Sequence, residues 1–89
     1  MAFYVVNHKV NDYNTWKKVY DSFEPIRKKF GVKELYAFQS VDNSNHVSVV
    51  GEGKLEDIQK FLHSDDLKNG MANAGIAGAP QIFVGENKK

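Results

Sequence analysis

His8 is the residue whose type and position best suit chemistry, because it lies late on the first predicted strand, next to Asn7. An imidazole there can titrate near neutral pH, act as a general base or bind a metal. The alternative is a histidine at a strand end that hydrogen-bonds a neighbouring carbonyl or carboxylate. On the same strand face as Tyr4 and Val6, its ring would border any cavity which that face lines. His8 is therefore the candidate catalytic residue.

Aromatic side chains that could surround a ligand occur in two segments. Tyr13, Trp16 and Tyr20 recur at helical spacing, and Tyr36 and Phe38 share one face of a predicted strand. Aromatic residues at such spacing usually belong to the core. Buried Tyr and Trp nevertheless need hydrogen-bond partners for their polar atoms. Three such residues on one stripe therefore make a pocket wall with polar groups more credible than three leucines would. We expect these five residues to be the candidate ligand-binding set.

The remaining histidines are weaker candidates. His46 adjoins a turn, which indicates an exposed hairpin residue, although strand pairing could bring an aromatic residue near it or near Ser48. His63 precedes Ser64, and we expect it to interact with carbonyls at a helix end. The three histidines have no metal-ligand spacing and lie on separate segments, so we predict no metal site.

Two further segments have ordinary interpretations. Residues 70–80 are rich in glycine but lack a phosphate-loop or dinucleotide motif, so we interpret them as close packing and turns, with a lid over a pocket as the alternative. Arg27, Lys28 and Lys29 form a basic cluster with Lys33. A solvated helix end explains it, and a patch for an anionic ligand or partner is the alternative.

Composition limits the function classes. The chain has 89 residues, which predicts a single domain over residues 1–89. It has no cysteine, so a thiolate nucleophile and a disulfide framework are excluded. A net charge of +1 argues against a nucleic-acid or membrane-surface partner. No apolar stretch or leader indicates a membrane or secreted protein, so we expect a cytoplasmic one. We also expect no cofactor.

The elements that position these residues begin with a strand over residues 3–10. A helix with Asp12 as N-cap follows, and its apolar stripe continues to Phe30. Pro25 lies inside this stripe and predicts a kink or break near residues 22–24. Gly31 is the predicted C-cap.

The second half repeats the alternation of strands and helices. Strands are predicted over 33–40 and 46–52, joined as a hairpin by a turn at 42–45. A helix from Leu55 gives way to a second helical piece capped by Ser64 and ended by Gly75. A loop over 75–80 precedes a last strand over 81–86. This order predicts an α+β, ferredoxin-like βαββαβ domain, a four-stranded antiparallel sheet with helices on one face.

Helices on one face leave the other face of this sheet uncovered. Two alternating apolar sets are available for that face: Phe3/Val5, Leu35/Ala37, Val47/Val49 and Phe83, or Tyr4/Val6, Tyr36/Phe38, Val50 and Ile82/Val84. Either set would expose a larger apolar patch than a monomer ordinarily tolerates. We therefore predict that two copies pair sheet to sheet as a twofold homodimer.

The chain resembles a known group of proteins at two sets of positions. They are Asp12-Tyr13-Asn14-Thr15-Trp16 with Phe23, Pro25, Arg27 and Gly31, and Ser64-Asp65-Asp66-Leu67 with Met71, Ala74-Gly75-Ile76, Gly78 and Pro80. These segments resemble small uncharacterised proteins of the dimeric α+β barrel superfamily. That superfamily includes antibiotic-biosynthesis monooxygenases, stress-responsive barrel proteins, muconolactone isomerases and haem-degrading monooxygenases. The resemblance implies a dimeric barrel and leaves the activity open.

Three functional hypotheses follow. The first is an apolar pocket between sheet and helices that binds a small aromatic or polyketide-like ligand. The second is a cofactor-independent monooxygenase or isomerase that uses His8 as base. The third is an interaction module whose aromatic rings fill the core and leave no cavity.

Overall fold

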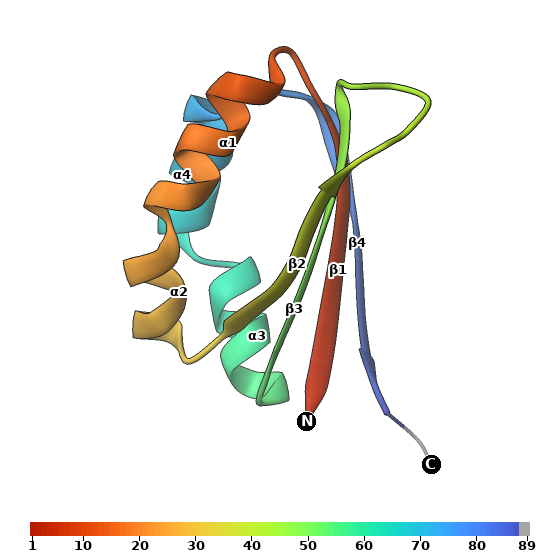
Figure 1. Cartoon of the computed structure of the whole chain (residues 1–89). Helices are drawn as coiled ribbons and strands as arrows, with labels where there is room; N and C mark the ends of the chain where they lie inside the picture. Colours follow the sequence, from red (N-terminus) through yellow and green to blue (C-terminus); the bar gives the residue numbers. More distant parts are fainter. Residues whose placement is uncertain (88–89) are drawn as a thin grey trace.

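The protein is built as a sheet with all its helices on one face, and the computed structural model describes residues 1–87 (Figure 1). The strands lie in the order β2-β3-β1-β4, and every neighbouring pair is antiparallel. This is the predicted ferredoxin-like arrangement. The elements in chain order are β1 (Ala2–Val10), α1 (Tyr13–Ser22), α2 (Glu24–Phe30), β2 (Lys33–Gln39), β3 (His46–Gly53), α3 (Leu55–Leu62), α4 (Asp65–Asn73) and β4 (Ile76–Glu86).

The helices begin and end where the sequence predicts. The Asp12 carboxylate accepts hydrogen bonds from the backbone and side chain of Thr15 and so caps α1. The predicted break falls at Phe23, and Pro25 lies in the first turn of α2, where its missing N–H costs nothing. Gly31 ends α2 at a φ of 79°, a conformation that favours glycine.

The last strand begins earlier than predicted. Residues 75–80 were expected to form a loop, but β4 starts at Ile76, and Ile76 and Ala77 pair with Val10 and Lys9 of β1. The pairing register of β1 with β4 shifts between Asn7 and Lys9, and Gly78 has a φ of 81°. The glycine therefore lies at an irregularity within the strand and does not end it. Pro80 is tolerated because β4 is an edge strand.

Strand register corrects the two apolar sets proposed from the sequence. Val5 pairs with Val50 and Phe83, and Val50 pairs with Tyr36. Val6 pairs instead with Val49 and Ile82, on the other face. The prediction placed Val5 with Val49 and Val6 with Val50, which is wrong by one residue between β1 and β3. A one-residue error exchanges the faces, and sequence alternation cannot fix the register when both faces are apolar.

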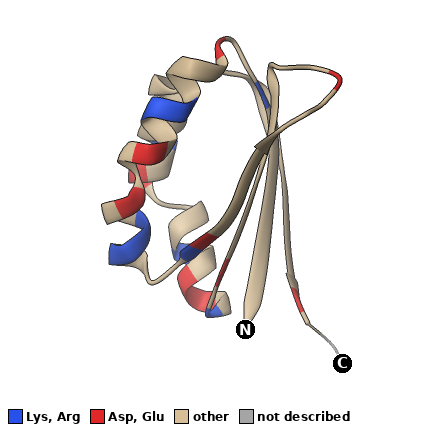
Figure 2. Cartoon of the chain, viewed as in Figure 1, with Lys and Arg blue, Asp and Glu red and all other residues tan. Residues whose placement is uncertain are grey.

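The face under the helices holds the core. Buried side chains of β1 and β3 pack there against buried side chains of α1 and α3. The strands contribute Tyr4, Val6, His8, Val47 and Val49, and the helices contribute Trp16, Ile58 and Phe61. Charged residues lie mostly on the helices (Figure 2). In residues 1–87, no helix is long and apolar enough to cross a membrane.

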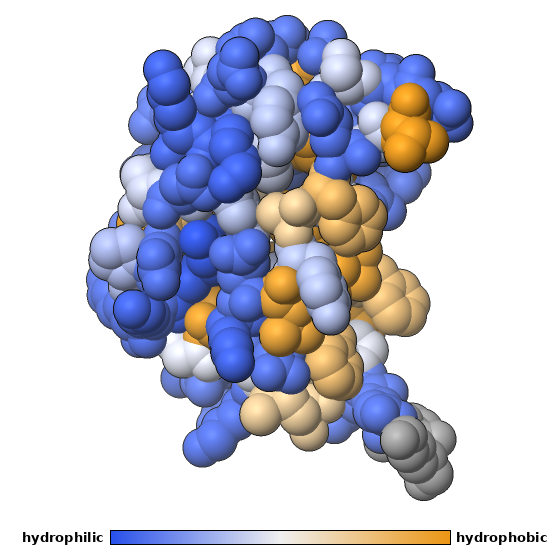
Figure 3. All heavy atoms as spheres, in the orientation of Figure 1, coloured by the Kyte–Doolittle hydropathy of each residue, from blue (hydrophilic) through white to orange (hydrophobic). Residues whose placement is uncertain are grey.

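The opposite side of the sheet, the open face, carries exposed apolar side chains that gather there (Figure 3). Its pairings form two adjacent rows across all four strands. The apolar row is Phe83–Val5–Val50–Tyr36. The polar row is Gln81–Asn7–Ser48–Phe38, in which Phe38 is the one apolar member.

Candidate functional site

A cavity of about 70 Å³ lies between the helices and the sheet. Strands β1 and β3 form its floor, and all four helices contribute to its walls. Its lining is apolar except for a few polar groups. The lining residues that matter below are Tyr4, His8, Trp16, Tyr20, Arg27 and Gly70.

His8 lies in the wall of this cavity and is 7% exposed. Neither of its ring nitrogens has a hydrogen-bond partner among the described residues. Burial lowers the pKa of His8 from 6.5 to about 4, and the charge of His46 acts in the same direction. The imidazole is therefore neutral at pH 7, with one ring nitrogen as a hydrogen-bond donor and the other as an acceptor.

Trp16 joins His8 to the aromatic stripe of α1. The His8 and Trp16 rings meet edge to face, with centroids 5.6 Å apart. Trp16 stacks on Tyr20 at 5.0 Å and contacts Tyr13 at 5.7 Å. Offset and edge-to-face rings attract one another, so this stripe holds the His8 ring against one wall. Tyr13 contacts Trp16 but does not itself line the cavity.

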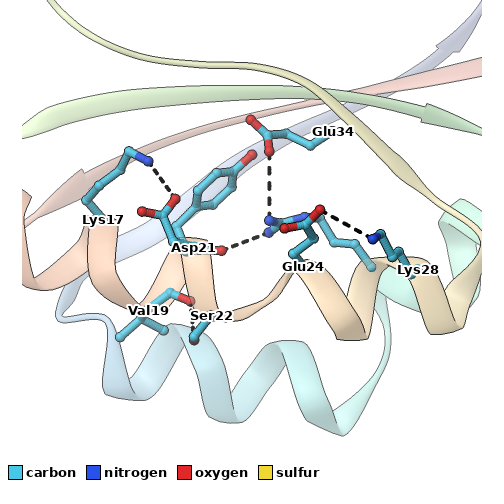
Figure 4. A network of polar contacts seen from close by, with 9 residues as sticks. Lys17, Val19, Asp21, Ser22, Glu24, Lys28 and Glu34 are labelled. Atoms are coloured by element: carbon cyan, nitrogen blue, oxygen red, sulfur yellow. Dashed lines mark hydrogen bonds and ion pairs between the residues drawn. The ribbon is translucent and has the colours of Figure 1, made fainter.

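Arg27 is a buried cation on α2, near its junction with α1. Figure 4 shows polar contacts of this region and labels Glu34, together with the Glu24–Lys28 and Lys17–Asp21 pairs. Its guanidinium donates to the Tyr20 carbonyl at 3.0 Å and lies 3.8 Å from the Glu34 carboxylate on β2. It also lies 4.4 Å from the centre of the Tyr20 ring. The predicted solvated helix end is therefore wrong for Arg27, because these three contacts compensate its burial.

Lys28 and Lys29, in contrast, are exposed, as expected of a solvated helix end. Lys28 pairs with Glu24 within α2, and Lys29 lies 3.6 Å from Asp66 on α4.

The burial of Arg27 could have been predicted from the sequence. Residues 16, 20, 23 and 27 are spaced four, three and four apart, which places Arg27 on the same helical face as the aromatic residues.

Tyr4 was missed as a site residue and lines the cavity opposite the helices. Its ring covers Gly51, where a Cβ would lie 2.3 Å from the ring, so glycine is required there. Burial raises the pKa of Tyr4 to about 12, so its hydroxyl stays protonated. Its position on the same face as His8 follows from strand alternation.

Tyr36 and Phe38 lie on the open face, away from His8, and are 65% and 54% exposed. The predicted aromatic set is thus divided between the two sides of the sheet, with Trp16 and Tyr20 in the cavity wall. Register explains the difference, because Ala37 and not Tyr36 pairs with the buried Val49.

A second hollow, of about 310 Å³, lies on the open face over the polar row. Asn7, Phe38, His46, Ser48 and Gln81 contribute to its lining. The Ser48 hydroxyl donates to the Asn7 side-chain oxygen, and Phe38 pairs with Ser48, as the sequence analysis allowed. His63 follows Leu62, which lines the first cavity, but its own side chain is exposed and lines neither hollow. It forms the C-cap of α3, where its backbone N–H donates to the Gln59 carbonyl.

No group of three or more His, Asp or Glu side chains within residues 1–87 could hold a metal ion. The chemistry that this site offers is hydrogen bonding from a neutral imidazole inside an apolar enclosure.

Comparisons with known proteins identify relatives of the whole fold. A family model described as "Domain of unknown function (DUF3764)" matches residues 1–79. No curated protein matches the chain. Many solved structures do match it, and three of them illustrate the likeness.

A Bordetella bronchiseptica protein assigned as an antibiotic biosynthesis monooxygenase superposes with a TM-score of 0.80 at 12% identity, covering 99% of this chain and 97% of its own. A Caulobacter crescentus protein with the same assignment gives 0.78 at 18% identity, covering 99% and 90%. A variant of SnoaB, a cofactor-independent oxygenase from Streptomyces nogalater, gives 0.78 at 10% identity, covering 99% and 93%. At these identities the likeness establishes the fold alone, and it confirms the resemblance to the monooxygenase-like α+β barrels.

Proposed function

This chain belongs to the family of the domain of unknown function DUF3764, and we propose that it is a homodimer that binds a small aromatic ligand in the His8 cavity. The observation that carries the proposal is the imidazole of His8, whose two nitrogens are buried in an apolar cavity wall without a partner in the described chain. A buried polar group of this kind costs about 1–3 kcal/mol. A ligand hydroxyl would recover that cost.

The chemistry of the lining supports an aromatic ligand with a polar atom. The rings of Tyr4, Trp16 and Tyr20 offer faces and edges for a flat molecule. A neutral imidazole can donate to a carbonyl or accept from a hydroxyl. Because most of the lining is apolar, a single polar group at His8 would set the ligand's orientation.

The size of the cavity requires that a wall moves when the ligand enters. Its volume of about 70 Å³ is smaller than the roughly 150 Å³ of an engineered cavity that accepts benzene. Helix α4 is the best candidate for the moving wall. It lies between the Ser64 cap and Gly75, whose φ is 71°, and it contributes the flexible side chain of Met71.

The open face supports the homodimer. Three of its aromatic side chains, Tyr36, Phe38 and Phe83, are 65%, 54% and 69% exposed. Because a buried aromatic side chain covers 150–250 Å², these three expose roughly 300–450 Å². The exposed area of these three side chains alone equals the largest apolar patch of a typical monomer, and Val5 and Val50 add to it. A second copy of the same face covers it without any other partner.

A cofactor-independent oxygenase or isomerase remains the second candidate, and the resemblance in fold to SnoaB favours it. Its base would be His8. A pKa of about 4 makes the imidazole a weak base at pH 7, whereas general bases work best with a pKa near the ambient pH. The cavity therefore supports binding more directly than proton abstraction.

The test compares phenol with toluene, which has the same ring without a hydroxyl. Trp16 is the chain's single tryptophan and lies beside His8, so its fluorescence reports cavity binding. Wild type is expected to bind phenol about tenfold more tightly than toluene, because the hydroxyl gains the His8 partner. In His8→Leu this preference is expected to disappear while toluene binding remains.

An equal preference in wild type and His8→Leu would contradict the role of His8. Oxygen uptake with a polyphenol separates the two candidate functions. Uptake that is lost in His8→Gln while binding persists would favour the oxygenase.

A further inference from the structure

We propose that Tyr36 of each copy inserts into the hollow over the polar row of its partner, so that the dimer forms two reciprocal contacts. The inference rests on the proposed homodimer and specifies how its two faces fit together. The observations that carry it are a projecting tyrosine and a polar hollow on the same uncovered sheet face.

Tyr36 ends the apolar row at the edge strand β2, and its side chain is 65% exposed. The hollow lies beside it, over the next row. Any covering of the apolar row by a second sheet therefore also covers the hollow. A covered hollow must be filled, because its polar groups would otherwise lose water without gaining a partner.

Tyrosine matches the chemistry of the hollow. Phe38, Asn7 and Ser48 all line it. The Ser48 hydroxyl already donates to the Asn7 side-chain oxygen, which leaves the Asn7 amide N–H groups as donors. A tyrosine ring would pack on Phe38, and its hydroxyl would accept from Asn7. Phe83 is as exposed as Tyr36, but it has no polar atom that could form a hydrogen bond with Asn7.

Twofold symmetry makes the contact reciprocal. In a face-to-face pair, the twofold axis lies in the plane between the two sheets. If the axis passes midway between Tyr36 and the hollow, it brings each tyrosine to the partner's hollow. One operation fills both hollows and covers both apolar rows. The hollow's volume of about 310 Å³ is large enough for a side chain.

The first test measures dimer dissociation by analytical ultracentrifugation. Tyr36→Phe keeps the ring and removes the hydroxyl, and we expect it to weaken the dimer about thirtyfold, because both symmetry-related hydrogen bonds are lost together. Tyr13→Phe, which removes a hydroxyl on the helix side, is the matched control and is expected to leave the dissociation constant unchanged. An unchanged constant in Tyr36→Phe would overturn the proposal.

The second test locates the contact. Tyr36 is replaced by the photoreactive p-benzoylphenylalanine, and isotope-labelled and unlabelled copies are mixed so that crosslinks between copies can be distinguished by mass. We expect crosslinks to the partner's residue 7 or residues 46–48. Crosslinks to the partner's residues 5, 50 or 83 would overturn the insertion and leave the homodimer standing, whereas a wild-type monomer would overturn both.

Discussion

The imidazole of His8 occupies a position where an apolar side chain would make the free protein more stable. Both of its nitrogens are buried without a partner in the described chain, beside the ring of Trp16. A buried donor or acceptor without a hydrogen bond is costly, and natural proteins retain such costs mainly at functional sites. We therefore interpret His8 as retained for binding.

The first prediction is that His8→Leu stabilises the ligand-free protein at pH 7 by about 1–3 kcal/mol, because it removes a buried polar group without a partner. Urea unfolding measures this change. His63→Leu, which replaces an exposed histidine, is the matched control and is expected to have little effect. A clear loss of stability in His8→Leu would show that the imidazole has a structural partner.

The same residue predicts a dependence of wild-type stability on pH. The folded protein holds His8 at a pKa of about 4, whereas the ordinary value is 6.5. The unfolded chain therefore binds a proton first as pH falls. Stability from this group is complete above pH 6.5 and is lost towards pH 4, by at most about 3 kcal/mol. His8→Leu is expected to lack this component of the pH dependence.

Strand alternation placed His8 on the same face as Tyr4 and Val6, and the structure confirms that placement. Arg27 was not predicted as a buried residue, because its contacts with the Tyr20 carbonyl and Glu34 depend on how α2 turns after Phe23. Tyr36 and Phe38 were assigned to the ligand, but their side of the sheet depends on a register that local sequence does not fix.

At the scale of the elements, close packing of α1 against α4 closes the cavity. Gly70 is buried on α4, and a Cβ there would lie 2.1 Å from the Phe23 ring. Phe23, at the break between α1 and α2, can therefore occupy its position only because Gly70 has no side chain. Both residues line the cavity, so this contact also sets its size.

The second prediction concerns Gly70→Ala. Helix propensity alone would favour alanine by about 1 kcal/mol. The clash with Phe23 is expected to outweigh this gain and to give a net loss of about 1–3 kcal/mol, measured by urea unfolding. Asn69→Ala, at an exposed neighbouring position, is expected to be neutral or slightly stabilising. Phe23→Leu should restore part of the loss in Gly70→Ala. A stabilised Gly70→Ala would contradict this packing.

The order and type of the elements were predictable because caps and periodicity agree along the chain. Asp12, Pro25, Gly31 and Ser64 each act where the sequence indicates. The start of β4 was not predictable from Gly75 to Pro80, because glycine and proline usually mark loops. Pairing with β1 overrides that local preference, and the edge position of β4 accommodates the irregularity.

At the scale of the whole molecule, the sheet has one covered face and one open face. The apolar row Phe83–Val5–Val50–Tyr36 crosses all four strands, and no charged residue interrupts it. A continuous apolar row of this kind on a monomer usually marks an interaction surface. We infer that a second copy covers it.

The third prediction is that Phe83→Glu converts the dimer to monomers. Two carboxylates would be buried in the interface without partners, and desolvation of such charges costs several kcal/mol. Light scattering after size-exclusion chromatography measures the mass. Leu55→Glu, at an exposed position on the helix side, is the control and is expected to remain dimeric. A dimeric Phe83→Glu would place the interface elsewhere.

Nitrogen NMR of the His8 ring, with and without phenol, tests the binding site most directly. At pH 7 we expect a neutral imidazole whose nitrogen shifts report no strong hydrogen bond. Saturating phenol is expected to move one His8 nitrogen to the value of a hydrogen-bonded ring, together with the Trp16 indole, while His46 and His63 stay unchanged. A charged His8 at pH 7, or phenol binding that leaves its nitrogens unmoved, would contradict a ligand site built around this residue.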